Sequence, residues 1–211
     1  MKYKYFLFDW DGSLGATLPL WFKAFKETFS DYGIKTDYKE IGEVVLGDWE
    51  GPKKLGITNL EEFFGKMEAE LMPKLPDVQL NPGVKETLEK IKSLGGKIGV
   101  VTTSKKRYVK NALKNNGLSK VVDVFLGRED VENYKPDPEI LYKALNFMGG
   151  RPSESIMVGD TVKDIEAAKR AGIDSALYFP DEYREYYDEV RQKGLGATYV
   201  IKSFQDLERF L

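Results

Sequence analysis

Short apolar runs recur along the chain, separated by longer amphipathic stretches. The runs cover residues 5–8, 98–101, 122–126, 156–158 and 175–178. Short apolar runs of this kind are typical of strands buried on both faces of a parallel sheet. Between them, apolar residues recur at the three- and four-residue spacing of helices at residues 84–94, 105–116, 138–148 and 162–171. This alternation predicts an α/β fold with a doubly wound parallel sheet, as in Rossmann-like proteins.

One interval breaks the alternation. Residues 16–80 contain no convincing buried strand, but they do contain amphipathic stretches at 20–32 and 60–72. Turn-forming residues suited to hinges stand at its two edges: Gly12, Gly15 and Asn81-Pro82-Gly83. We therefore predict an inserted α-helical cap domain at 16–81, and a core domain formed by 1–15 and 82–211.

Composition excludes several classes of function. The 211 residues include 32 basic and 34 acidic side chains, so the near balance of charge disfavours a nucleic-acid partner. The chain has no cysteine and no histidine, which excludes disulfides, thiol nucleophiles, zinc fingers and imidazole chemistry. Neither a membrane span nor a signal peptide is apparent, and we expect a cytoplasmic protein with no membrane partner.

Polar residues follow four of the predicted structural units at the edge where an open α/β sheet binds its ligands. These residues are Asp9-Trp10-Asp11-Gly12-Ser13, Thr102-Thr103-Ser104, Lys135-Pro136-Asp137-Pro138 and the segment from Gly159 to Asp164. Taken together, they predict a phosphate and metal site.

Asp9 and Asp11 are two residues apart at a strand end, so an extended backbone can point both carboxylates the same way. One carboxylate can attack phosphorus while the other protonates the leaving oxygen and later activates water. A capped turn explains the same pattern about equally well when it is taken alone.

Asp160 and Asp164 stand at a strand end and in the first turn of the next helix. Simple helix capping is the better explanation of this pair by itself. Combined with Asp9, however, they form an all-oxygen cluster, and hard oxygen ligands without His or Cys favour Mg²⁺ over zinc.

Lys135 and Thr102 offer an ammonium and a hydroxyl that can hold phosphate oxygens as charge develops. A lone lysine is usually a solvated surface charge, and a lone threonine at a strand end is usually a turn residue. Only the joint arrangement favours a functional role.

These four motifs, in this order, resemble those of the haloacid dehalogenase-like hydrolase superfamily over essentially the whole chain. The resemblance implies Asp9 as the nucleophile, Asp11 as the acid and base, and Thr102, Thr103 and Lys135 as phosphate-binding groups. It further implies that Asp9, the backbone carbonyl of Asp11 and Asp160 hold Mg²⁺, with Asp164 in support. The helical insertion is similar to the cap of phosphoglycolate phosphatase-like and β-phosphoglucomutase-like members.

The chain departs from this family pattern at two places. Many relatives carry an acidic residue and a serine just after the first motif, where this chain has Gly15-Ala16-Thr17, and asparagine where it has Thr103. The first departure puts the usual contacts between linker and cap in question. Neither touches the groups expected to transfer phosphate.

The expected activity is Mg²⁺-dependent hydrolysis of a small phosphorylated metabolite, such as a phosphoglycolate-like phosphomonoester. A phosphomutase is the closest alternative, and a phospho-accepting protein without hydrolysis is a more distant one. A dehalogenase has no use for Asp11 or a metal cluster, and the glycine-rich motifs of nucleotide oxidoreductases and P-loop enzymes are absent.

Substrate choice is expected to depend on the cap. Trp21, Trp49, Lys53 and Lys54 are candidate contacts there, although cap core and solvated charges explain them better. The aromatic segment 183–187 fits packing on the protein's own sheet better than a contact surface. The sequence does not decide between a monomer and a small homo-oligomer.

Overall fold

The first apolar run forms strand β1 (Tyr5–Phe8), which lies inside the sheet and is buried on both faces. Its side chains alternate between two separate core clusters, because successive residues of a strand point to opposite faces. Phe6 and Phe8 belong to one cluster, while Tyr5 and Leu7 belong to the other. Burial on both sides explains why this strand is continuously apolar.

The computed structural model describes residues 1–46 and 48–211. Six strands pair in parallel in the order β3-β2-β1-β4-β5-β6. After β1 they are β2 (Lys97–Val101), β3 (Val124–Leu126), β4 (Ser155–Gly159), β5 (Asp174–Tyr178) and β6 (Tyr199–Ile201). The doubly wound parallel sheet is confirmed, with β3 starting two residues later than expected and β6 as an additional edge strand.

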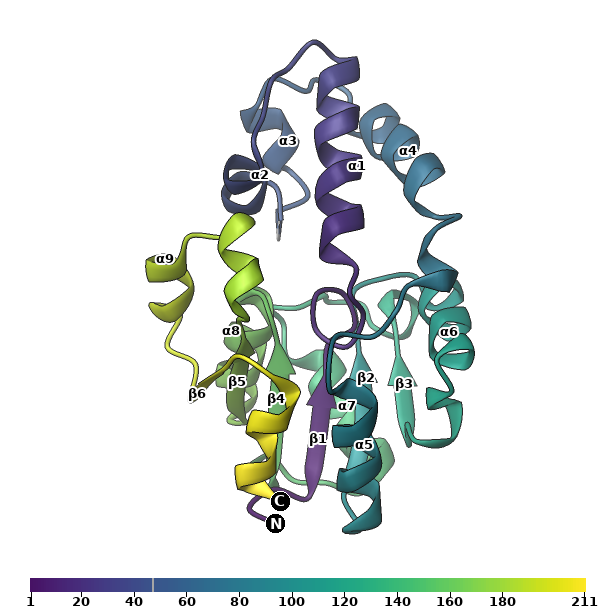
Figure 1. Cartoon of the computed structure of the whole chain (residues 1–211), viewed down its shortest axis with the longest axis vertical. Coiled ribbons are helices and arrows are strands. Elements are labelled where there is room, and N and C mark those ends of the chain that lie inside the picture. The colour runs from purple at the N-terminus through teal and green to yellow at the C-terminus, as the bar shows by residue number, and fades with distance from the viewer. Residues whose placement is uncertain (47) are drawn as a thin grey trace.

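Helices cover both faces of the sheet (Figure 1). One core cluster joins β1 to α5 (Val84–Ser93), α6 (Lys106–Asn115) and the C-terminal 3-10 helix (Phe204–Phe210). The other joins β1 to α7 (Glu139–Met148) and α8 (Val162–Ala171). All four predicted core helices are therefore present, with ends that differ from expectation by no more than one residue.

A helical cap is inserted between β1 and β2, and Figure 1 shows it beyond the carboxyl ends of the strands. It contains α1 (Leu18–Asp31), α2 (Tyr38–Val44), α3 (Gly51–Lys54) and α4 (Leu60–Leu71). The helix starts follow from local chemistry, since Asp37 and Asn59 accept hydrogen bonds from backbone N–H groups in the first turns of α2 and α4. The two longest cap helices are the two amphipathic stretches predicted from the sequence.

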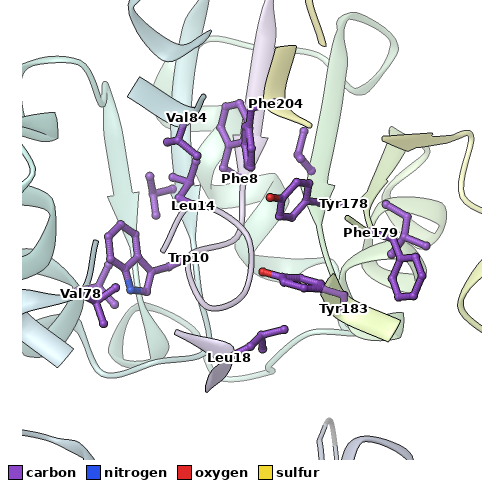
Figure 2. Packing of buried hydrophobic residues seen from close by; sticks show 14 of the residues in the cluster. Phe8, Trp10, Leu14, Leu18, Val78, Val84, Tyr178, Phe179, Tyr183 and Phe204 are labelled. Atoms are coloured by element: carbon purple, nitrogen blue, oxygen red, sulfur yellow. The ribbon is translucent and has the colours of Figure 1, made fainter. Parts of the chain in front are cut away.

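The loop after β1 is fixed by buried aromatic residues on both sides (Figure 2). Trp10 is 1% exposed, and it packs so closely that a side chain at Gly15 would lie 2.8 Å from the indole ring. Behind the loop, the rings of Phe8 and Tyr178 both pack on Phe204. This loop carries Asp9 and Asp11, so the core holds their backbone in place.

Across residues 1–46 and 48–211, no helix combines the length and the apolar character that crossing a lipid bilayer requires.

Candidate active site

Strand register brings the predicted site residues to one edge of the sheet. Phe8 at the end of β1 pairs with Val100 of β2 on one side and with Val158 of β4 on the other. Asp9 follows β1 directly, while Thr102 and Asp160 each lie two residues beyond the partners of Phe8. Motifs about 90 and 150 residues apart in the sequence therefore meet at the carboxyl ends of three adjacent strands.

Lys135 is buried between two of the predicted carboxylates. Its Nζ atom donates to Oδ1 of Asp9 at 2.7 Å and to Oδ1 of Asp164 at 2.6 Å. A third hydrogen bond of 3.1 Å reaches the carbonyl of Val101. Burial lowers the pKa of Lys135, but the charges of Asp164 and Asp9 outweigh this effect and raise it above its ordinary value. Lys135 is thus a permanent cation beside Asp9, as a phosphate-binding role requires.

Asp9, Asp160 and Asp164 form a cluster of three buried carboxylates. One oxygen from each lies within 4.8 Å of one oxygen from each of the others. The Oδ1 atom of Asp160 is buried and has no hydrogen-bond partner among the described residues. Three converging carboxylates with an oxygen left unpaired, and neither His nor Cys in the chain, fit a hard divalent cation.

The protonation of the cluster reflects its burial. Burial raises the pKa of Asp9 to about 7 against the opposing charge of Lys135, and Asp164 and Asp11 add to the rise. The pKa of Asp160 is raised well above its ordinary value, again by burial first and then by Asp164 and Asp9. Three carboxylates face one buried ammonium, so the cluster resists full ionisation unless a further positive charge is present.

Two glycines make room for the cluster. A side chain at Gly12 would lie 2.4 Å from Oδ2 of Asp160, and one at Gly159 would lie 2.4 Å from the carboxyl carbon of Asp164. Gly12 also has a φ of 69°, which other residues rarely adopt. The glycine after the second aspartate in the first motif thus serves both the turn and the space beside Asp160.

The Asp11 carboxylate lies outside this cluster and contacts the cap. Its Oδ1 atom accepts a 2.8 Å hydrogen bond from the indole N–H of Trp21, and its Oδ2 atom accepts one from the hydroxyl of Ser104. Thr102 is buried, and its hydroxyl oxygen accepts a hydrogen bond from the backbone N–H of Ser104. The two aspartates of the first motif therefore have different surroundings, which suits two different chemical roles.

A cavity of about 120 Å³ opens between the cap and the carboxylates. Asp9, Asp11, Thr103 and Lys135 line it on the core side, and Trp21 and Trp49 line it on the cap side. At its edge, Glu68 of the cap pairs with Lys105 of the core at 2.8 Å. Five of the predicted site residues thus line a space large enough for a small ligand, Asp160 among them, whereas Thr102 and Asp164 are buried behind it.

Three residues border the site in ways that the sequence did not favour. Trp21 was named as a candidate contact, although cap core explained it better, and its half-buried ring brings its N–H to Asp11. Tyr183 and Tyr187 were expected to pack on the sheet, yet their hydroxyls reach the backbone of Gly12 and the carboxylate of Asp160. Their spacing of four residues gave no usable signal, because the 3-10 helix at Asp181–Glu185 ends before Tyr187 and the α-helical period does not apply.

Lys53 and Lys54 behave as the solvated charges that the sequence favoured. Both side chains are exposed, and they pair with Glu50 and Asp48 respectively. Neither lines the cavity.

Replacing Asp160 with Asn should stabilise the metal-free protein at pH 7. A raised carboxyl pKa means that the folded state binds the proton more tightly than the unfolded state does, so stability falls as pH rises above about 4. Asparagine removes this penalty, and we expect a gain of roughly 1–3 kcal/mol at pH 7 that vanishes near pH 4. Urea unfolding with a chelator across this range measures the difference. A variant less stable than the wild type at pH 7 would show that the cluster is not under electrostatic strain.

The comparisons with known proteins agree with this geometry. A family model described as haloacid dehalogenase-like hydrolase matches residues 6–178. The pyrophosphatase PpaX of Halalkalibacterium halodurans is 35% identical over 209 residues, covering 95% of this chain and 93% of the relative.

Solved structures share the whole architecture. A protein from Lactobacillus plantarum assigned as a phosphoglycolate phosphatase superposes with a TM-score of 0.85 at 20% identity, and the match covers 100% of both chains. One from Thermotoga maritima assigned as a β-phosphoglucomutase gives a TM-score of 0.72 at 26% identity over 98% of both chains. The chain belongs to the haloacid dehalogenase-like hydrolase family and is a phosphatase of that family with a helical cap between β1 and β2.

Proposed function

We propose that this protein is a Mg²⁺-dependent phosphatase that hydrolyses a small phosphorylated metabolite through a phosphorylated Asp9. The observation that carries the proposal is the placement of Asp9. Its carboxylate lies at the cavity, 2.7 Å from the Lys135 ammonium and beside two further buried carboxylates. A nucleophile needs such a cationic partner to approach a phosphate dianion.

We propose that Asp9, the backbone carbonyl of Asp11 and Asp160 hold the metal, with Asp164 in direct or water-mediated support. The unpaired Oδ1 atom of Asp160 and the all-oxygen donor set support this assignment. When bound, Mg²⁺ supplies the positive charge that offsets the carboxylates and the incoming phosphate.

The chain's own groups would then act in two steps. An Asp9 oxygen attacks phosphorus and forms an O–P bond, while the bond to the leaving oxygen breaks and Asp11 donates the proton that this oxygen needs. In the second step Asp11 takes a proton from water, which attacks phosphorus and releases Asp9. Lys135, Thr102 and Thr103 would hold the phosphoryl oxygens throughout.

The division of the chain into a core (1–15 and 82–211) and a cap (16–81) is also a proposal. The two segments that connect the core and the cap support it, because they are hydrogen-bonded to each other at the proposed boundaries. The N–H of Ala16 donates to the carbonyl of Gln79 at 2.9 Å, and the N–H of Asn81 donates to the carbonyl of Leu14 at 2.9 Å. Two adjacent connecting segments of this kind are suited to act as a hinge between the domains.

A second candidate substrate is inorganic pyrophosphate. The PpaX relative is named a pyrophosphatase, and two further cations, Arg128 and Lys163, line the cavity. Within residues 1–46 and 48–211 neither forms an ion pair with a carboxylate, so both are available to a second anionic group. A phosphomutase is the third candidate function. Its support is the fold that this chain shares with the Thermotoga maritima protein.

The test is phosphate release from p-nitrophenyl phosphate, phosphoglycolate and pyrophosphate, each with Mg²⁺ and with chelator. Metal-dependent release from a phosphomonoester supports the main proposal, and release from pyrophosphate alone supports the second candidate. If no compound releases phosphate, the hydrolytic proposal fails and transfer reactions become the better explanation.

Replacing Asp11 with Asn should separate proton transfer from metal binding. We expect kcat to fall by roughly 10²–10⁴-fold, because no other carboxylate occupies that position. The rise in melting temperature on adding Mg²⁺ should stay close to that of the wild type, since the Asp11 carboxylate lies outside the three-carboxylate cluster. A variant that loses the Mg²⁺-induced stabilisation would contradict this division of roles.

A further inference from the structure

The segment between β5 and β6 reaches the candidate active site through two tyrosine hydroxyls. Tyr187 donates to Oδ2 of Asp160 at 3.2 Å. Tyr183 donates to the backbone carbonyl of Gly12 at 2.7 Å and accepts a hydrogen bond from the side-chain amide of Asn81 at 3.3 Å. Both rings are buried, at 6% exposed for Tyr183 and 4% for Tyr187. Figure 2 shows Tyr183 beside the loop that follows β1.

The cap holds this segment from the opposite side. The ring of Phe22 in α1 lies 4.5 Å from the ring of Tyr186 and 5.9 Å from that of Tyr187, between centroids. In α2, a side chain at Gly42 would lie 2.2 Å from the backbone carbonyl of Tyr186, so the two backbones are in close contact. Tyr187 is therefore fixed between the cap and the carboxylate, and its ring has little freedom to move away from Asp160.

The two oxygens of Asp160 are consequently unequal. Oδ2 has a hydroxyl donor, whereas Oδ1 has no hydrogen-bond partner in the described part of the chain. A hydrogen bond to one oxygen of a carboxylate fixes its rotation about the last side-chain bond and leaves the other oxygen for a cation. Partners of this kind commonly orient metal ligands in proteins.

We propose that Tyr187 is a positioning residue that holds Asp160 with its Oδ1 atom toward the metal. The inference rests on the proposed function, because it takes Asp160 as a metal ligand. It goes beyond that proposal by assigning a role to the β5–β6 segment, and by naming the Asp160 oxygen that serves the cation. Contacts of the same segment with Phe22 and Gly42 link that orientation to the cap.

The test compares Tyr187→Phe with Tyr186→Phe by calorimetric titration of Mg²⁺ into the otherwise intact protein. The two changes each remove one hydroxyl from neighbouring buried rings. The Tyr186 hydroxyl makes no hydrogen bond within the described residues, so Tyr186→Phe is a matched control. Circular dichroism and the metal-free melting temperature check that both variants keep the fold.

We expect Tyr187→Phe to raise the Kd for Mg²⁺ by about 10-fold or more, and Tyr186→Phe to change it by less than about twofold. At saturating Mg²⁺, kcat of Tyr187→Phe should return close to the wild-type value. The proposed role of the hydroxyl is to orient the carboxylate of Asp160, which excess Mg²⁺ can still engage. A Kd within twofold of the wild type for Tyr187→Phe, or an equal weakening in the control, would overturn the inference.

The proposed function can fail separately. If the wild-type protein binds Mg²⁺ but releases no phosphate from any ester or from pyrophosphate, the phosphatase proposal is wrong. The titrations would then still decide the role of Tyr187. A wild type that binds no Mg²⁺ removes both.

Discussion

Asp9→Asn is expected to lower phosphate release by about 10⁴-fold or more, the largest loss of activity that we predict. An amide oxygen is a poor nucleophile, and we assign the other carboxylates of the site to different tasks, Asp160 and Asp164 to the metal and Asp11 to proton transfer. Asp164 is held by Lys135 and by Thr161, and the Asp11 carboxylate is held by Trp21 and Ser104. Initial rates at saturating Mg²⁺ and substrate measure the effect.

The matched control is Asp37→Asn. Asp37 is exposed and caps α2, a position where asparagine serves as well as aspartate, so its replacement should leave both activity and fold unchanged. An Asp9→Asn protein that is folded and keeps even a tenth of wild-type activity would exclude Asp9 as the nucleophile.

Lys135→Met is expected to cause the largest loss of stability, about 3–5 kcal/mol for the metal-free protein at pH 7. The ammonium is 3% exposed and is the buried cation that Asp9 and Asp164 contact directly. Methionine fills most of the space but leaves two buried carboxylates without their partner. Burial raises the pKa of Asp9 to about 7, so protonation neutralises this carboxyl and the loss should shrink as pH falls from 7 toward 4.

Lys143→Met serves as the control for this change. Lys143 pairs with Glu139 at 2.6 Å and donates to the carbonyl of Asp130, but its side chain is 43% exposed, so its loss should cost far less than that of the buried Lys135. Urea unfolding of the three proteins at pH 4 and pH 7 makes the comparison. Equal stability of Lys135→Met and the wild type at pH 7 would mean that the buried ion pairs contribute nothing net.

The two stability predictions concerning the cluster have opposite signs, and the charge balance explains why. Three buried carboxylates share one buried ammonium, so removing a carboxylate relieves repulsion while removing the ammonium increases it. A site assembled in this way stores unfavourable electrostatic energy that binding of a cation can release. Loss of stability in exchange for function is common at active sites.

The parts of the fold predicted from the sequence are those in which local pattern and burial agree. The strands at 5–8 and 156–158 are continuously apolar because both of their faces are covered. The helices that cover the sheet carry apolar residues on the side that faces it. β6 was not predicted because it is a three-residue edge strand whose Val200 is partly exposed, so it lacks a buried-strand pattern. The cap helices α2 and α3 are likewise too short for a clear helical period.

The candidate site divides in the same way. The proximity of Asp9, Thr102 and Asp160 could be predicted from the sequence, because each directly follows a strand of a parallel sheet. The carboxyl ends of neighbouring parallel strands lie at one edge of the sheet. The contacts of Trp21 with Asp11 and of Tyr187 with Asp160 could not be predicted. They depend on how the cap and the β5–β6 segment dock on the core. Docking of this kind leaves no periodic signal in the sequence.

Phosphorylation of Asp9 can be observed in a rapid-quench experiment at a single turnover, with a ³²P-labelled form of whichever test compound the protein hydrolyses. If Asp9 is the nucleophile, label should appear on the protein before it appears as free phosphate. Borohydride treatment of the quenched protein should convert residue 9 to homoserine, which peptide mass spectrometry detects, and Asp9→Asn should carry no label. Phosphate release at the wild-type rate with no label on the protein at any quench time would contradict the account.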